Sequence, residues 1–171
     1  KDKKKRGMYL SAARSLLFNA VISERIKHDA FSKVRQGDVL MLEGTQSVFH
    51  LEQLDDSIEQ RFADKDVDIT APMWGAGELM TTGNPQLLEQ QIAEQYSDFA
   101  QGLPRFGLKQ ERRRIRLTVQ NADIEVLANS NTDNLPAVKV SFILPAGSYA
   151  TTLLRELLNY QDCSQRALPK S

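Results

Sequence analysis

The chain has 171 residues and a mass of 19.3 kDa, enough for one ordinary domain or for one domain and part of another. With 41% hydrophobic and 26% charged residues, its composition excludes an intrinsically disordered chain. No apolar run reaches the roughly 18 to 20 residues that cross a bilayer, which excludes a transmembrane helix. The single cysteine, Cys163, cannot form an internal disulfide and fits a reducing cytoplasm. His28 and His50 are not at zinc-like spacings from it, so the sequence predicts no metal site.

The formal net charge of zero hides a strong segregation of charge along the chain. Residues 1–37 carry ten Lys and Arg against three Asp and Glu, a net +7. Residues 38–98 carry two against thirteen, a net −11, and residues 99–171 carry ten against six, a net +4. Because polyanion binding depends on local basic surface, nucleic acid is a candidate partner for either end and not for the middle.

The first predicted element is an amphipathic helix over residues 10–31, where apolar side chains recur at helical spacing without Gly or Pro. Ser11, Ser15, Asn19 and Ser23 recur every four residues and form a narrow polar stripe beside Arg14. Two interpretations of this stripe remain open. It indicates either a close helix–helix contact through small side chains or a face that meets a sugar–phosphate backbone.

After a turn at Gly37, the sequence predicts a hairpin of strands 39–42 and 47–51. A weak helix over 54–62, a short extended piece at 67–69 and a turn-rich loop over 70–78 follow. Asn84 and Pro85 are typical of an N-cap and first helical position, and the helix they open is expected to stop near Gly102.

The last third of the chain opens with a basic segment over residues 107–116. Strands are predicted at 124–127 and 137–144, joined by a polar loop over 129–136. The second of these strands ends wholly apolar, which predicts that it enters a core. A turn over 145–148 leads into a closing helix over 149–159. This mixture of helices and short strands indicates the α+β class.

Motifs of several common enzyme classes are absent or incomplete in the sequence. Gly75 and Gly77 lack the third glycine of a dinucleotide-binding loop, and neither a P-loop nor a Gly-x-Ser-x-Gly elbow occurs. Two basic tracts are more informative, residues 3–6 and 112–114. Such clusters gain affinity for nucleic acid by displacing counterions from phosphates, although a solvated surface patch is the alternative.

Four stretches together resemble the tRNA pseudouridine synthase D (TruD) family. The first is Leu-Ser-Ala-Ala-Arg-Ser-Leu-Leu-Phe-Asn at 10–19, and the last is Phe-Ile-Leu-Pro-Ala-Gly-Ser-Tyr-Ala-Thr at 142–151, followed by Leu-Arg-Glu at 154–156. Gly-Asp at 37–38 and Ile-Thr-Ala-Pro at 69–72 with Gly75 support them in the same order. The resemblance covers the chain up to about Asn159.

The resemblance implies an α+β architecture in which a family-specific insertion interrupts a mixed-sheet pseudouridine synthase domain. Residues 1–117 correspond to most of that insertion, and residues 118–171 to the closing strands and helix of the catalytic domain. The start at Lys1 without Met favours a piece of a longer protein, whose partner is then the missing amino-terminal half of the catalytic domain.

Pseudouridine synthases attack the target nucleotide with an aspartate, which in this family lies in a Gly-x-Lys-Asp-Lys-His-Ala motif. Lys1-Asp2-Lys3 matches three letters of it, but Lys4-Lys5 stands where His-Ala is required, and Asp2 lies only eight residues before Leu10. We therefore expect no catalytic residue in this chain. The resemblance also implies chemistry without a cofactor or a metal ion.

What remains is a substrate-binding and RNA-binding role. An enzyme that modifies a base takes it out of the stack and holds it by stacking and hydrogen bonds, so one wall of a uridine pocket is expected here. The resemblance implies an isomerase that converts uridine at position 13 of tRNA to pseudouridine in the cytoplasm. The alternative is a non-catalytic RNA-binding or interaction module with the insertion fold. The residues predicted to bind the nucleotide are Phe142, Gly147, Ser148, Tyr149 and Arg155. For Arg155 a contact to a phosphate and an ion pair with a carboxylate of the missing half both stay open, and a core position is the alternative for Tyr149 and the favoured one for Phe142. Those predicted to contact RNA phosphates are Lys3, Lys4, Lys5, Arg6, Arg14, Arg112, Arg113 and Arg114.

Overall fold

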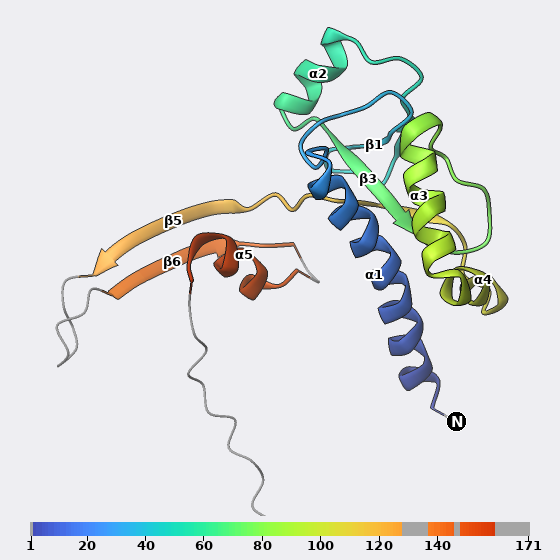
Figure 1. Cartoon of the computed structure of the whole chain (residues 1–171). Coiled ribbons are helices and arrows are strands. Elements are labelled where there is room, and N and C mark those ends of the chain that lie inside the picture. Colours follow the sequence, from blue (N-terminus) through green and yellow to red (C-terminus); the bar gives the residue numbers. More distant parts are fainter. Residues whose placement is uncertain (1, 128–136, 146–147, 160–171) are drawn as a thin grey trace, which may run out of the picture. The chain divides into compact units, whose positions relative to one another are not determined.

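The structure is a computed structural model that describes residues 2–127, 137–145 and 148–159. Two compact units follow one another along the chain, residues 1–116 and residues 117–171. The first unit contains most of the helices and a four-stranded sheet, and the second contains a two-stranded hairpin and one helix (Figure 1). The α+β class predicted from the sequence is confirmed. In chain order the elements are α1 (Lys3–Lys27), β1 (Val39–Leu42), β2 (Val48–His50), α2 (Asp56–Ala63), β3 (Val67–Met73), α3 (Gly83–Gln95), α4 (Ser97–Arg105), β4 (Glu111–Arg114), β5 (Gln120–Leu127), β6 (Ala137–Ile143) and α5 (Ala150–Leu157).

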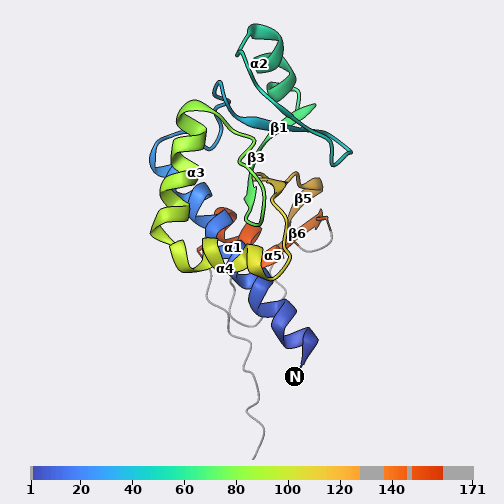
Figure 2. The ribbon, with the colours of Figure 1, turned by 90° about the vertical axis from the view of Figure 1, so that its right-hand side faces the viewer.

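The sheet of the first unit is antiparallel throughout, in the order β2-β1-β3-β4. The predicted hairpin is present as β1 and β2, with Leu40 opposite Phe49. On one side of the sheet α1 packs against β3 and against α3 and α4, and α2 lies apart from these three helices (Figure 2). Buried apolar side chains of α1, β1 and β3, among them Leu17, Leu40 and Ile69, form the centre of the core.

Helix α1 begins seven residues before the predicted start and ends four residues before the predicted end. Asp2 caps its amino terminus, because its carboxylate accepts a hydrogen bond from the Lys4 backbone N–H at 3.2 Å. After the helix, Asp29 takes a left-handed backbone conformation with φ of 50°. The basic tract at residues 3–6 is therefore helical, which hydrophobic periodicity could not show because the tract has no apolar residue.

Strand β3 runs to Met73, so the predicted loop over 70–78 is wrong in its first four residues. Pro72 indicated a loop because proline lacks the N–H of a strand ladder. In the structure β1 pairs with β3 only from Val67 to Ile69, and Pro72 faces β4 alone, opposite Arg112. The missing N–H therefore costs no hydrogen bond to β1. The single helix predicted from Asn84 to near Gly102 is two helices in the structure, α3 and α4, which are divided at Tyr96.

The hairpin of the second unit has one apolar and one polar face. Ile124 pairs with Val140 and Val126 with Val138, and paired residues of antiparallel strands project to the same side. The opposite face carries Asp123, Glu125, Lys139 and Ser141, with an ion pair between Lys139 and Glu125 at 3.2 Å. This alternation over paired strands is typical of a sheet that covers a core on one side.

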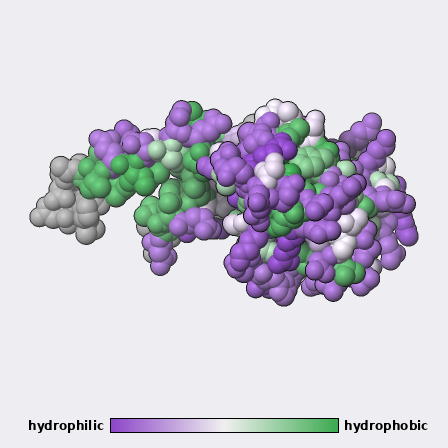
Figure 3. Space-filling model, turned by 90° about the horizontal axis from the view of Figure 1, so that it is seen from above, coloured by the Kyte–Doolittle hydropathy of each residue, from purple (hydrophilic) through white to green (hydrophobic). Residues whose placement is uncertain are grey.

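That apolar face is open, since none of the residues described between 117 and 159 is buried. Val126 is 71% exposed and Ile124 59% exposed, and apolar surface gathers on this hairpin (green in Figure 3). The prediction that strand 137–144 enters a core is therefore not met by the described residues of this chain. Helix α5 repeats the pattern, with Leu153, Leu154 and Leu157 on one side of an amphipathic helix.

The open hairpin predicts a difference in hydrogen exchange between the two units. An isolated two-stranded hairpin is marginally stable in water, whereas β1 and β3 are buried in a core. In the 171-residue chain we expect amides of β5 and β6 to exchange at least a hundredfold faster than amides of β1 and β3, measured by NMR or mass spectrometry. Equal protection in the two sheets would show that the second unit is stable by itself.

Candidate functional site

Arg112 lies inside the first unit, with its side chain 2% exposed, and forms an ion pair with Glu89 of α3. Its Nη1 is 3.0 Å from both Glu89 carboxylate oxygens. Its Nε and Nη2 donate to the hydroxyl and the backbone carbonyl of Thr70, at 3.0 and 2.8 Å. Thr81 donates a further hydrogen bond to Glu89 at 2.8 Å. The donors of Arg112 are thus used within the protein, which corrects its prediction as a phosphate-contacting surface residue.

Burial and the neighbouring positive charge shift the pKa of Glu89 in opposite directions. Desolvation raises the pKa of the Glu89 carboxyl above its ordinary value, and the nearby Arg112 guanidinium acts in the opposite direction. In a second buried ion pair, Arg25 Nη1 lies 2.7 Å from Asp38 Oδ1. Arg25 also donates to the backbone carbonyls of Ala30 and Lys33. Both pairs stabilise the position of secondary-structure elements, and neither presents a cation to a ligand.

Arg14 also turns inward, with its side chain 11% exposed. Its Nη2 donates to the Met73 carbonyl at 2.6 Å, the Lys109 carbonyl at 2.9 Å and the Glu111 carboxylate at 3.0 Å. Its Nε is buried without an acceptor among the described residues. The structure therefore corrects the sequence prediction for Arg14: the guanidinium connects three segments of the chain and is not available to phosphates.

Arg113 and Arg114, the other arginines of the predicted cluster, differ in exposure because successive side chains of β4 point to opposite faces of the strand. Arg114 is half-buried, paired with Glu43 and bonded to the Leu42 carbonyl. Arg113 projects from the other face of the strand and is exposed. Among the described residues Arg113 has no ion pair. Because three consecutive residues of a strand or helix cannot all face one way, the sequence favoured Arg112 and Arg114 over Arg113 as phosphate contacts. The structure reverses this order, since Arg113 is the exposed one of the three.

The basic tract at the start of α1 is exposed as predicted. Lys3, Lys4, Lys5 and Arg6 are all on the surface and form no ion pair within the part of the chain that the structure describes. Lys109 shares these two properties and was missed by the sequence analysis, although its one signal was present: it lies in the basic segment 107–116. These side chains and Arg113 could meet a polyanion, and among the described residues Lys65 and Arg105 are likewise exposed and without an ion pair.

The predicted nucleotide-binding residues lie in the second unit, and Gly147 falls outside the described residues. Phe142 is half-buried in β6, on the same face as Val140, and the Ser148 N–H donates to the Pro145 carbonyl at 3.2 Å. Tyr149 is the N-cap residue of α5 and its side chain is 75% exposed. Arg155 is exposed in the last turn of α5. The turn between β6 and α5 thus presents an aromatic ring to solvent.

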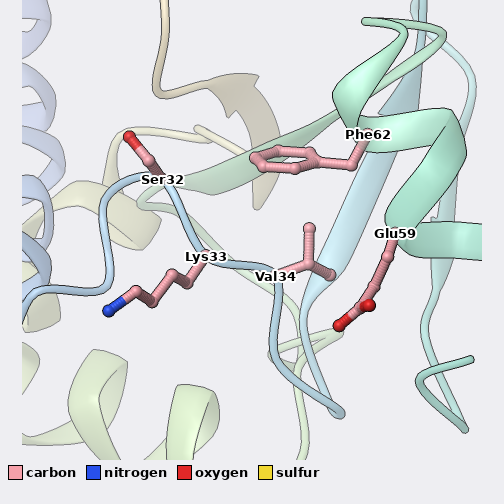
Figure 4. A pocket seen from close by; sticks show the side chains of 5 residues that line it. All are labelled: Ser32, Lys33, Val34, Glu59 and Phe62. Carbon is pink, nitrogen blue, oxygen red and sulfur yellow. The ribbon is translucent and has the colours of Figure 1, made fainter. Parts of the chain in front are cut away.

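A cavity of about 340 Å³ lies elsewhere, between α2 and the loop after α1. Glu59 and Phe62 of α2 line one side, and Ser32, Lys33 and Val34 of the loop line the other (Figure 4). The Arg116 guanidinium stacks on Phe62, 4.0 Å from the ring centroid. No residue that the sequence analysis predicted to bind nucleotide or phosphate lines this cavity. Of the helices that the structure describes, none is long and apolar enough to cross a membrane.

The chain is therefore an α+β protein of two units. The first unit has exposed lysine and arginine side chains, and the second exposes the aromatic ring of Tyr149. A family model described as tRNA pseudouridine synthase D (TruD) matches residues 2–157. The chain therefore belongs to the TruD family.

Proteins and a solved structure similar to this chain agree with that assignment. The tRNA pseudouridine synthase D of Colwellia psychrerythraea is 68% identical over 97% of this chain, which spans 46% of that protein. The one of Pseudoalteromonas atlantica is 40% identical over 95% of this chain and 44% of the relative. A crystal structure of the putative tRNA pseudouridine synthase D from Methanosarcina mazei has a TM-score of 0.70 and 23% identity, over 84% of this chain and 36% of that one, and supports the fold. The chain thus spans less than half the length of these curated relatives.

Proposed function

We propose that this chain is the carboxy-terminal part of a tRNA pseudouridine synthase, an isomerase that converts uridine at position 13 of tRNA to pseudouridine without a cofactor. The observation that carries the proposal is the family match over residues 2–157, in a chain that spans less than half of its named relatives. The reaction takes place on tRNA, and we place it in the cytoplasm.

In this proposal residues 1–117 are most of the family-specific insertion, and residues 118–171 close the catalytic domain. The division of the chain into compact units after Arg116 supports that boundary. The open apolar face of β5 and β6 supports a partner for the second unit, which we propose to be the amino-terminal half of the same catalytic domain. Burying side chains such as Ile124 and Val126 there would supply the core that the described part of the second unit lacks.

The second unit would then contribute one wall of the uridine pocket. Tyr149 supplies an exposed ring for stacking. Ser148, just before α5, and Arg155, in the last turn of α5, supply polar groups. Gly147 completes the set by permitting close approach of the backbone, and Phe142 borders it from β6. The exposed cations of the first unit, Lys3 to Arg6 and Arg113, would contact tRNA phosphates.

The catalytic aspartate is proposed to lie outside this chain. Asp2, whose neighbours imitate the family motif, is the N-cap of α1, and its carboxylate accepts the Lys4 N–H. A nucleophile needs to face the target nucleotide, whereas this carboxylate satisfies the first turn of a helix. This local role supports its exclusion as the catalytic residue.

The test compares the full-length protein with the 171-residue chain on tRNA labelled with tritium at carbon 5 of uridine. Formation of the carbon–carbon bond replaces that hydrogen, so pseudouridine formation releases tritium. We expect release by the full-length protein and none by the chain alone. Full-length protein that binds tRNA but releases no tritium would favour the non-catalytic RNA-binding module. Release by the chain alone, abolished in Asp2→Ala, would return Asp2 to the catalytic role.

A further inference from the structure

Two of the sequence motifs that carry the family resemblance meet at one short segment, residues 108–111. Arg14, from the motif in α1, donates from Nη2 to the Lys109 carbonyl at 2.9 Å and to the Glu111 carboxylate at 3.0 Å. The same nitrogen donates to the Met73 carbonyl at 2.6 Å, at the end of β3. One buried guanidinium therefore fixes this segment to both α1 and β3.

Gly75, which follows the Ile-Thr-Ala-Pro motif at 69–72, contacts residues 108–111 as well. Its N–H donates to the Gln110 side-chain oxygen at 2.8 Å, and a Cβ at this position would lie 2.3 Å from the Lys109 carbonyl carbon and oxygen. The adjacent Ala76 donates to the Leu108 carbonyl at 2.7 Å and accepts from the Gln110 N–H at 2.8 Å. We call these contacts of Arg14, Gly75 and Ala76 the 108–111 clamp.

The clamp fixes the backbone of Lys109 and leaves its side chain in solvent. Lys109 is exposed and forms no ion pair among the described residues. Glu111, two positions on, is neutralised by Arg14, and Arg113, two further on, is an exposed cation. Because side chains two apart share a face of an extended strand, Lys109 and Arg113 form a cationic row beside β4, which is an edge strand of the sheet.

Exposed cations beside an edge strand, without ion pairs among the described residues, fit a polyanionic backbone. Each phosphate that such a row neutralises releases counterions, and a fixed backbone reduces the entropy lost on binding. We propose that Lys109, together with Arg113, contacts the phosphate backbone of the RNA, and that Arg14 and Gly75 are positioning residues that hold Lys109 in place. The inference rests on the proposed function for the identity of the RNA.

The first experiment measures tRNA binding and turnover of the full-length protein with Lys109→Ala, Lys109→Arg and, as a matched control, Lys27→Ala. Lys27 is an exposed lysine of α1 that already pairs with Glu24. For Lys109→Ala we expect KM to rise about threefold to tenfold with kcat unchanged, and the slope of log affinity against log salt to fall by about 1. Lys109→Arg should retain most affinity, and Lys27→Ala should change neither quantity. An unchanged slope and KM in Lys109→Ala would overturn the proposal.

The second experiment tests the positioning role with Arg14→Lys, which keeps the positive charge but is one bond shorter than arginine and does not reach the position of Nη2, from which all three hydrogen bonds are donated. We expect its KM to rise as in Lys109→Ala, and the double variant to bind no more weakly than either single variant, because both changes remove one interaction. Additive losses would show that Arg14 does not act through Lys109. If Arg14→Lys does not fold, Gln110→Ala, which removes the acceptor of the Gly75 N–H, replaces it in the same cycle.

The two proposals fail separately. If the unchanged full-length protein releases no tritium from tRNA, the proposed function is wrong, and the effect of Lys109→Ala on the salt slope still decides the phosphate contact. If tritium is released at the normal rate and the salt slope of Lys109→Ala equals that of the unchanged protein, the phosphate contact alone is wrong.

Discussion

Arg112→Ala is expected to destabilise the first unit by about 3–5 kcal/mol, because it leaves the Glu89 carboxylate buried without its partner. Glu89→Ala should cost a similar amount, since the guanidinium is then the uncompensated charge. Trp74 is the only tryptophan and lies in this unit, so its fluorescence during urea unfolding reports on it. Replacing the pair together, as Glu89→Leu with Arg112→Met, should recover only part of the loss, because it removes both buried charges but leaves the Thr81 hydroxyl and the Thr70 carbonyl without these partners.

Arg113→Ala is the matched control, on the next residue of the same strand but with an exposed side chain. We expect it to change the free energy of unfolding by less than about 0.5 kcal/mol while weakening tRNA binding. The two neighbours thus separate stability from binding. A loss below 1 kcal/mol for Arg112→Ala, the level of a surface ion pair, would contradict the structural role assigned to Arg112.

Tyr149→Ala is expected to lower turnover by the full-length protein about tenfold to a hundredfold. Stacking of a base on an aromatic ring is worth about 1–3 kcal/mol, and about 1.4 kcal/mol corresponds to a factor of ten in rate. In this chain the ring is 75% exposed at the start of α5, so its removal should cost the chain little stability. Tritium release at saturating tRNA, with thermal melting alongside, measures both quantities.

Tyr149→Phe distinguishes two ways in which the ring could act. If stacking is its role, the phenylalanine variant keeps most activity, and if the hydroxyl donates a needed hydrogen bond, the variant is as slow as Tyr149→Ala. A buried tyrosine in the completed protein would behave differently again, losing about 3–5 kcal/mol of stability on truncation to alanine. A large fall in melting temperature with normal turnover per folded molecule would remove Tyr149 from the pocket.

Local patterns were sufficient for elements whose residues carry their own signals. The hairpin of β1 and β2 follows from two apolar runs around Gly44, and β6 follows from its β-branched residues. The patterns failed where a distant contact decides the structure. Pro72 belongs to a strand because β4, about forty residues further along the chain, pairs with it on the side that needs no N–H. The amino-terminal turns of α1 depend on a cap at Asp2, which a search for apolar periodicity passes over.

The same limit applies to the predicted phosphate-binding cations. A run of arginines indicates positive charge, but whether an arginine faces solvent depends on acceptors elsewhere in the sequence. Glu89 lies 23 residues from Arg112, and Met73 lies 59 residues from Arg14. Neither partner is recognisable from spacing. Lys109 lies in the basic segment 107–116, but membership of that segment does not show which of its cations is held in place. The contacts around its backbone set it apart from other surface lysines.

The three consecutive arginines of β4 leave the alignment of that strand with β3 poorly specified by charge alone. Sliding β4 by one residue in one direction would bring Arg113 to Glu89 in place of Arg112, with an equivalent ion pair and opposite faces for all other side chains. Such a shift would move Ile115 out of its buried position and break the hydrogen bond that its N–H donates to the Ile69 carbonyl at 3.1 Å. Sliding the other way would bring Glu111 to Glu89, two like charges in a dry interior. Strand alignment therefore depends on the residues that flank the arginine triplet, and substitutions at Glu111 or Ile115 would produce misaligned folded chains before they produced unfolded ones.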